Sequence, residues 1–318
     1  RLNKPQGNFR IIHEFYGIVH GLSCSSCIDL YRTINIIHMK NKLIIIAVLS
    51  STLGFSQSWN QVVVPSTDKL NDIEFASNAV GYISGDNETL LKTMDGGESW
   101  TTIIPAGISV PFTYNIGDLE FVSETVGFCN VPNAGSTYKT IDGGDNWTLV
   151  DDTELGNFCY RGAIYAESEN QYLLGGAGCF QSAMIKENNG GVWSEKVDAL
   201  ENFNADEQVV QMDFFNQLGI AATSSQYFLR TIDGGQFWDT ILAPISIGSK
   251  LTSVVIVDAL NMLAGYEENG TGFGVLRSNN AGLTWTIDNN SGTFLYPAFL
   301  SVEVAMNGDL YAGAQPSN

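Results

Sequence analysis

Histidine is the scarcest chemically versatile residue in this sequence. All three histidines, His13, His20 and His38, lie in the first 38 residues, so the chain from Ser58 onward has none. That long segment therefore lacks the usual base of catalytic triads and the commonest metal ligand. It also lacks a GxSxG nucleophile motif and a phosphate-binding glycine loop. We expect no metal, no cofactor and no enzymatic centre of these kinds.

Basic residues are also few. From Ser58 onward, 32 acidic residues accompany nine basic ones, which gives a net charge of −23. Nucleic acids and anionic lipid surfaces are bound through Lys and Arg that neutralise phosphates. The sequence therefore argues against a nucleic-acid partner, and the acidity is typical of a well-solvated surface.

Long apolar runs are missing apart from one short stretch. Two lysines follow Met39, then comes an apolar run over Leu43–Leu53 and then Gly54-Phe55-Ser56, the pattern of a secretory signal peptide. The run is about half the ~20 residues of a membrane span. We predict a signal peptide over residues 39–57, no membrane span, and a secreted, periplasmic or cell-surface protein. Residues 1–38 are interpreted as untranslated upstream or disordered sequence, and residues 58–318 as the functional domain.

Cysteines are few and odd in number within that domain. They are Cys129, Cys159 and Cys179. Export permits one disulfide, and Cys159 could pair with Cys179 or with Cys129. The sequence does not choose between the two pairings.

Self-similarity is what the sequence has in abundance. An eight-residue segment over 93–100 recurs over 140–147 and 231–238, with a variant over 278–285 and a weaker copy over 186–193. The tryptophans that end these copies are 47, 46, 45 and 47 residues apart. Strand-like runs flank each copy, and two more short strands precede it, as at Ile73–Phe75 and Val80–Ile83. Four short strands per period of ~45 residues predict an all-β fold, a β-propeller of four-stranded blades.

The repeated segment has a structural role. An aspartate before two glycines can fold its carboxylate onto backbone N–H groups, and the glycines can adopt positive φ. A preceding Thr or Ser adds a hydrogen bond, and the tryptophan packs between sheets. The residues assigned to this corner are Asp95, Gly97, Trp100, Asp142, Gly144, Trp147, Asn188, Trp193, Asp233, Gly235, Trp238, Asn280, Gly282 and Trp285. Their carboxylates are expected to serve structure rather than catalysis or metal binding.

These segments resemble the Asp box, S/T-x-D-x-G-x-x-W, of BNR-repeat propellers. The pattern occurs in sialidases, sortilin-like receptors, xyloglucan-active hydrolases and the photosystem II assembly factor family. The resemblance covers about Trp59 to Asn318. It implies the fold and leaves the activity open, because one fold hosts many functions.

The two ends of the repeat region are incomplete in complementary ways. Trp59–Val64 matches the strand that follows each Asp box, whereas Ala298–Val304 and Asp309–Ala312 match the first two strands of a unit. One blade completed by both ends would remove exposed strand edges. We therefore predict six blades, or seven if the chain is truncated.

Two kinds of glycan chemistry need consideration. A sialidase resemblance implies three arginines that clamp a carboxylate, and the domain has only Arg161, Arg230 and Arg277. Arg230 and Arg277 occupy the repeat position of a lysine in other units, so we expect them at the surface, and the family's Arg-Ile-Pro signature is missing. A hydrolase with two carboxylates about 5–9.5 Å apart stays open as the alternative.

The loops that join successive blades carry most of the remaining candidates. Aromatic residues with a few polar groups around a central depression suit a sugar or peptide ligand, although packing of the blade seams is an alternative role. The candidate ligand-binding residues are Phe112, Tyr114, Phe158, Tyr160, Arg161, Phe203 and Tyr296. We predict a non-enzymatic binding or scaffold module for an extracellular polysaccharide or protein. The oligomeric state is left open.

Overall fold

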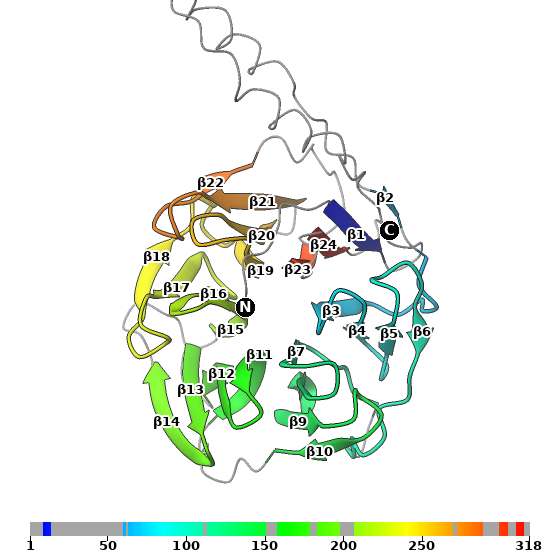
Figure 1. Cartoon of the computed structure of the whole chain (residues 1–318). Helices are drawn as coiled ribbons and strands as arrows, with labels where there is room; N and C mark the ends of the chain where they lie inside the picture. Colours follow the sequence, from blue (N-terminus) through cyan, green and yellow to red (C-terminus); the bar gives the residue numbers. More distant parts are fainter. Residues whose placement is uncertain are drawn as a thin grey trace, which may run out of the picture.

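The computed structural model places four-stranded sheets around a central axis (Figure 1). It describes residues 9–13, 60–61, 63–110, 113–150, 158–178, 183–197, 207–269, 272–288, 299–304 and 310–314. Within each regular sheet, the first strand lies nearest the axis and the last lies at the rim. The all-β propeller predicted from the repeat is confirmed.

Five blades are formed by four consecutive antiparallel strands each. Blade 1 has β3 (Leu70–Phe75), β4 (Gly81–Gly85), β5 (Leu90–Thr93) and β6 (Thr101–Thr102). Blade 2 has β7 (Leu119–Phe121), β8 (Gly127–Val131), β9 (Ser136–Thr140) and β10 (Trp147–Leu149), with a short 3-10 turn η1 (Pro132–Ala134). Blade 3 has β11 (Phe158–Ser168), β12 (Gln171–Gly178), β13 (Ala183–Asn189) and β14 (Val192–Val197). Blade 4 has β15 (Val209–Phe215), β16 (Leu218–Thr223), β17 (Tyr227–Thr231) and β18 (Asp239–Leu242). Blade 5 has β19 (Lys250–Ile256), β20 (Met262–Glu268), β21 (Gly272–Ser278) and β22 (Thr286–Ile287).

The predicted number of blades, six or seven, is wrong: within the described ranges the blades built from four consecutive strands number five. The remaining strands form a further, mixed sheet in the order β2 (Asn60–Gln61), β1 (Phe9–His13), β24 (Leu310–Ala314) and β23 (Phe299–Val304). In this sheet β1 pairs in parallel with both of its neighbours. It therefore lacks the antiparallel meander of a blade.

The two ends of the repeat region do meet in that mixed sheet, but not as a regular blade. Strand β1 lies between β2 and β24 and comes from the segment interpreted above as upstream or disordered sequence. The assignment of residues 1–38 and of the signal peptide over 39–57 stays a prediction.

Aromatic rings fill the seams between neighbouring blades. The ring of Tyr82 in β4 stacks on Phe121 of blade 2, with centroids 3.8 Å apart, and Tyr165 of blade 3 stacks on Phe214 of blade 4 at 4.1 Å. Small residues make room for them: a Cβ on Gly127 would lie 2.5 Å from the ring of Phe121. Buried side chains of neighbouring blades thus form separate hydrophobic clusters, each shared across one seam.

Two sequence expectations concern features away from the seams. Cys129 is a buried free thiol, so the pairing of Cys159 with Cys129 is not formed. The Cys159 side chain and Cys179 lie outside the described residues, and the other pairing stays a prediction. Among the residues that the structure describes, no helix is long and apolar enough to cross a membrane.

Candidate functional site

The Asp box is a closed network of local hydrogen bonds, as the copy over residues 140–147 shows. The Thr140 hydroxyl accepts the backbone N–H of Gly144 at 3.0 Å and donates to Asp142 Oδ1 at 2.9 Å. Asp142 Oδ1 also accepts the N–H of Asn146, and Trp147 Nε1 donates to the Gly144 carbonyl. Gly144 has φ +90°, which an L side chain rarely adopts. A glycine at this position therefore suits the backbone conformation of the corner.

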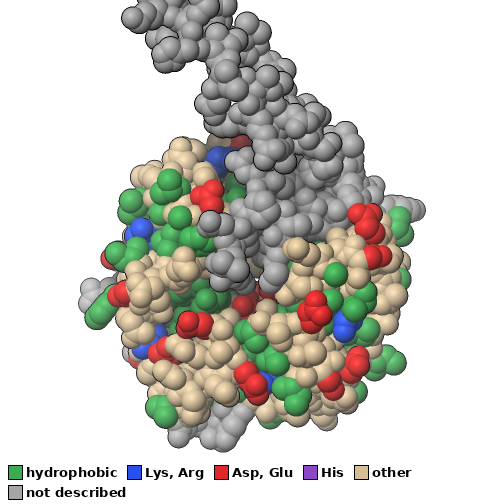
Figure 2. All heavy atoms as spheres, in the orientation of Figure 1, with side chains coloured by type: hydrophobic (Ala, Val, Ile, Leu, Met, Phe, Trp, Pro, Cys, Tyr) green, Lys and Arg blue, Asp and Glu red, His purple; other side chains and the backbone are tan. Residues whose placement is uncertain are grey.

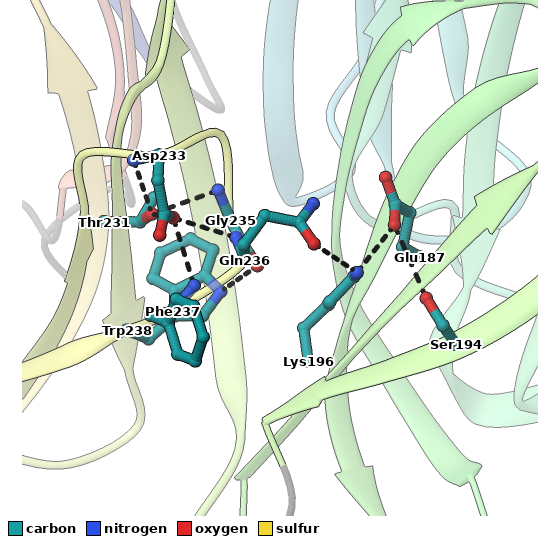
Figure 3. Close-up of polar contacts among 9 residues, drawn as sticks. All are labelled: Glu187, Ser194, Lys196, Thr231, Asp233, Gly235, Gln236, Phe237 and Trp238. Carbon is teal, nitrogen blue, oxygen red and sulfur yellow. Dashed lines mark hydrogen bonds and ion pairs between the residues drawn. The ribbon is translucent and has the colours of Figure 1, made fainter.

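Three other copies form the same corner. Figure 3 shows the one in blade 4, where Thr231 accepts the N–H of Gly235 and Asp233 accepts the N–H groups of Gln236 and Phe237. In blade 5, Asn280 replaces the aspartate and still accepts the N–H of Thr284 at 3.0 Å. A carboxylate charge is therefore not needed to hold the corner.

The charged boxes stabilise the ionised form of their aspartate. Partial desolvation opposes ionisation at Asp95, but hydrogen bonds from the Ser99 hydroxyl and N–H and from Thr93 outweigh it and lower the pKa to about 2. Hydrogen bonds, first from Asn146, also lower the pKa of Asp142. A general acid needs the opposite shift, so these carboxylates are unsuited to proton donation.

The copy over residues 186–193 folds differently. Lys186 stands where the other copies have Thr or Ser, and the two glycines come one residue later. Gly190 and Gly191 form a two-residue hairpin turn with positive φ, and Asn188 pairs directly with Trp193. In blade 2, by contrast, Trp147 pairs with Thr140, which lies seven residues earlier. Asn188 still accepts the N–H of Gly191 at 3.0 Å, but blade 3 has no Asp box.

Side chains on the innermost strands connect consecutive blades around the axis. Asp72 Oδ2 accepts the N–H of Leu119 in blade 2 at 2.8 Å, and Asp118 Oδ2 accepts the N–H of Ile164 in blade 3. Gln211 of blade 4 accepts the N–H of Val254 in blade 5 at 3.0 Å. These three acceptors occupy the same position in their blades. They were not among the site residues predicted from the sequence. A signal for the two aspartates was present, because the pattern Asp-x-Glu-Phe occurs both at 72–75 and at 118–121.

Two of these carboxyl groups form a pair. Asp118 shares a hydrogen bond with Asp72, and the side chain of each residue is buried. Desolvation, followed by the nearby charge of Asp72, raises the pKa of Asp118 well above its usual value. The protonated form of Asp118 is therefore favoured at this junction of two blades. Carboxylates of a glycosidase stand about 5–9.5 Å apart so that a sugar or water can enter, whereas this hydrogen bond closes that gap.

A cavity of about 400 Å³ opens beside this pair, where the blade-joining segments approach the axis. It lies on the face predicted to bind a ligand, because strand-two-to-three turns and blade-joining segments both contribute to it. Eight of its twelve lining residues have polar or charged side chains. The lining residues are Lys69, Asn71, Asp72, Asp86, Asn115, Gly117, Asp118, Pro132, Gly162, Val210, Gln211 and Thr252. Figure 2 shows that the face drawn there carries more acidic than basic side chains.

The polar groups at this opening are held in place. Asn71 Nδ2 donates to Asp86 Oδ1 at 2.9 Å and to the Ile116 carbonyl at 3.0 Å. Lys69 provides the only cation among the described lining residues. The cavity can therefore offer fixed amide and carboxylate groups and one positive charge to a polar ligand.

The aromatic site predicted from the sequence is only partly described. Tyr114 is buried in the seam between blades 1 and 2, and burial raises its pKa to about 12. The start of β11 contains Phe158, Tyr160 and Arg161, but the side chains of these three residues are outside the described part of the structure. Three further candidates lie wholly outside the described residues: Phe112, Phe203 and Tyr296. The predicted aromatic site stays a prediction.

Arg230 and Arg277 occupy equivalent positions in the repeat, and we expected both at the surface. This expectation is wrong for Arg230. Arg230 is buried, and its Nε donates to the Ala281 carbonyl in the next blade. Arg277 is exposed and forms an ion pair with Asp288 at 2.9 Å. Seam packing, which the repeat pattern does not reveal, explains the difference. Among the described residues, no three His, Cys, Asp or Glu side chains are grouped to hold a metal ion.

Comparison with known proteins agrees with this architecture. The family model for the photosynthesis system II assembly factor YCF48 matches residues 52–106, less than a fifth of the chain. No curated protein matches the chain in sequence.

Three solved structures illustrate the similarity in fold. YCF48 from Cyanidioschyzon merolae has 16% identity and a TM-score of 0.51, over 77% of this chain and 92% of that one. A GH74 enzyme from Niastella koreensis has 13% identity and a TM-score of 0.53, over 77% of this chain but 46% of that one. A chain in a nidogen–laminin complex has 13% identity and a TM-score of 0.53, over 78% and 85%. Together with the Asp boxes seen above, these similarities identify the chain as a β-propeller of the BNR type.

Proposed function

We propose that the protein is a secreted, non-enzymatic binding or scaffold module that holds an extracellular glycan or protein ligand at the axial cavity. The observation that carries this proposal is the cavity itself, about 400 Å³ in volume and lined by positioned polar groups from several blades. That volume lies within the range of small-ligand sites. A ligand there would contact amides, carboxylates and the single positive charge of Lys69.

Glycoside hydrolysis is the second candidate, because GH74 enzymes share the fold. The chain spans less than half of the Niastella koreensis enzyme. The only paired carboxyl groups seen at the described part of the cavity, Asp72 and Asp118, are hydrogen-bonded to each other and to backbone N–H groups. Both groups are thus already engaged in joining blades. This arrangement favours binding over hydrolysis.

One experiment separates the two candidates. The purified chain is tested on a glycan array and on an array of extracellular matrix proteins, and every retained glycan is then incubated with the protein and analysed for released sugars. We expect retention of a ligand without product. Release of sugars by the protein, absent from a mock purification, would overturn the non-enzymatic proposal.

A matched pair of variants tests the location of the site. Lys69 precedes the first residue of β3, and Lys250 occupies the same position before Leu251 in blade 5 but does not line the cavity. Lys69→Glu is expected to weaken binding of the retained ligand, whereas Lys250→Glu leaves it unchanged. Equal affinities of the two variants would place the ligand elsewhere.

A further inference from the structure

In most described seams, the Asp box of one blade fills the seam with the blade before it. A Cβ on Gly144 in the blade 2 box would lie 3.2 Å from Ile103 Cδ1 of blade 1. A Cβ on Gly235 in the blade 4 box would lie 3.2 Å from Leu173 Cδ1 of blade 3. The second glycine of each of these boxes therefore lies in close contact with an apolar side chain of the preceding blade.

The preceding blade also binds the box through polar groups. Tyr82 Oη donates to the Gly143 carbonyl at 3.1 Å, and Lys92 Nζ donates to the same carbonyl at 2.9 Å. Arg230 makes the corresponding bond to the Ala281 carbonyl of blade 5. At the seam between blades 3 and 4, Lys196 joins Glu187 to Gln236 of the box (Figure 3).

The seam between blades 2 and 3 has neither an Asp box in the later blade nor polar side chains of the earlier blade bound to one. Blade 3 has the short hairpin in place of a box, and a Cβ added at Gly190 or Gly191 would meet no atom within 4 Å. Blade 2 has Phe128 at the position of Tyr82, so it has no hydroxyl to offer. Lys139, the counterpart of Lys92, forms an ion pair with Glu169 at 2.8 Å instead.

The consequence is an open groove of about 330 Å³ between blades 2 and 3. The half-buried indole of Trp193 lies in its wall and meets Tyr172 edge to face, with centroids 5.6 Å apart. The lining residues are Lys139, Thr148, Leu149, Val150, Glu169, Asn170, Tyr172, Asn188, Gly191 and Trp193. We name these residues the seam groove.

We propose that the seam groove binds a neutral hexopyranose unit of a polysaccharide. This inference rests on the proposed binding function and assigns a second site and a ligand class to it. Aromatic side chains beside a few polar groups suit the apolar face and the hydroxyls of a sugar ring. Lys139 and Glu169 neutralise each other, and Asn170 adds a side-chain amide. The net charge of −23 beyond Ser58 disfavours sugars that carry carboxylates.

The test uses the full chain and two tryptophan insertions at equivalent positions. Thr148 lines the groove and its hydroxyl donates to the Lys139 carbonyl at 3.2 Å; Thr101 makes the same contact with Lys92 in blade 1, outside the groove. Both residues are exposed on strands, where tryptophan is tolerated. Binding of cellohexaose, mannohexaose, maltohexaose and a galacturonate hexamer is measured by calorimetry for wild type, Thr148→Trp, Thr101→Trp and Trp193→Ala.

We expect at least one neutral hexasaccharide to bind, with the affinity lowered about tenfold or more by Thr148→Trp and Trp193→Ala and unchanged by Thr101→Trp. Thr148→Trp decides the matter if Trp193→Ala does not fold. Binding that Thr148→Trp leaves intact would remove the groove from consideration while the proposed function stands. Absence of binding by all three neutral sugars at millimolar concentration would overturn the groove proposal, and the array experiment would then judge the proposed function separately.

Discussion

Asp72 accepts the backbone N–H of Leu119 at 2.8 Å, across the gap between the innermost strands of two blades. Asp118 repeats the contact toward Ile164, and the two carboxyl groups are themselves hydrogen-bonded. A buried N–H without an acceptor would cost about 1–3 kcal/mol. These side chains therefore help to hold consecutive blades together where the inner strands are too far apart to pair.

The shared proton makes this connection sensitive to pH. Because the pKa of Asp118 is raised in the folded protein, the folded protein keeps this proton to a higher pH than the unfolded chain does. The stabilising contribution is thus present below the unfolded pKa of about 4 and declines as the pH rises toward the folded pKa. Asp118→Asn keeps an acceptor for Ile164 and can donate to Asp72 without a titrating proton. We expect it to raise Tm more at pH 8 than at pH 4.

The measurement is thermal unfolding at both pH values, with Asp239→Asn, at an exposed position of β18, as the control. A gain of 1 kcal/mol corresponds to about 2–4 °C in a domain of this size class. An identical change in Tm at pH 4 and pH 8 would contradict the shared proton.

The Asp boxes predict the opposite dependence on pH. The pKa of Asp95 is lowered to about 2 by its hydrogen bonds, so its contribution to stability is present above the unfolded pKa and is lost as the pH falls from about 4 to about 2. Asp95→Asn copies the arrangement of Asn280, which holds its corner without charge. We expect the variant to lose less stability than wild type between pH 5 and pH 2.5.

Urea unfolding at several pH values measures this difference. Glu98→Gln, at an exposed position in the same corner, is the control and should follow the wild-type curve. A curve for Asp95→Asn that coincides with wild type would show that this box contributes nothing to acid sensitivity.

The local features of the fold could be predicted because each is contained in a few neighbouring residues. The corner at residues 140–147 is closed by a hydroxyl, an aspartate and two glycines, and the hydrogen bonds that close it span four residues or fewer. The copy at residues 186–193 differs because one hydroxyl is missing and the glycines are displaced by one residue. Only the strand register shows that this changes the corner into a tight hairpin.

The features that were missed depend on contacts between blades. Asp72 and Leu119 are 47 residues apart. The repeated Asp-x-Glu-Phe singles out the aspartate, but it does not indicate which blade the side chain contacts. Arg230 has the sequence context of an exposed strand residue, yet the carbonyl that it binds lies 51 residues away. The number of blades also depends on how both ends pair, which the period alone does not determine.

The hydroxyl residue that begins each box, threonine in three copies and Ser278 in the fourth, should be more important than its small size suggests. Thr231 is buried, and its hydroxyl is the acceptor for the Gly235 N–H. Thr231→Val keeps the shape and removes the acceptor, so we expect a loss of about 1–3 kcal/mol in the free energy of unfolding. Thr240→Val, at an exposed position in β18, should change it by less than about 0.5 kcal/mol. Equal effects of the two substitutions in urea unfolding would argue against the role of the hydroxyl.

The two repeat-equivalent arginines provide the sharpest test of how seams are held. Arg230 is buried and donates to the Ala281 carbonyl of the next blade, whereas Arg277 pairs with Asp288 at the surface of its own blade. Arg230→Met retains most of the packing but leaves that carbonyl without its charged donor, and we expect a loss of about 1.5–3 kcal/mol. Arg277→Met breaks an exposed ion pair, which is worth about 0–1 kcal/mol and less in high salt. Urea unfolding in low and high salt should therefore show a large, salt-independent loss for the first variant and a small, salt-dependent loss for the second. The reverse order would mean that polar bonds from one blade to the next box do not hold the ring together.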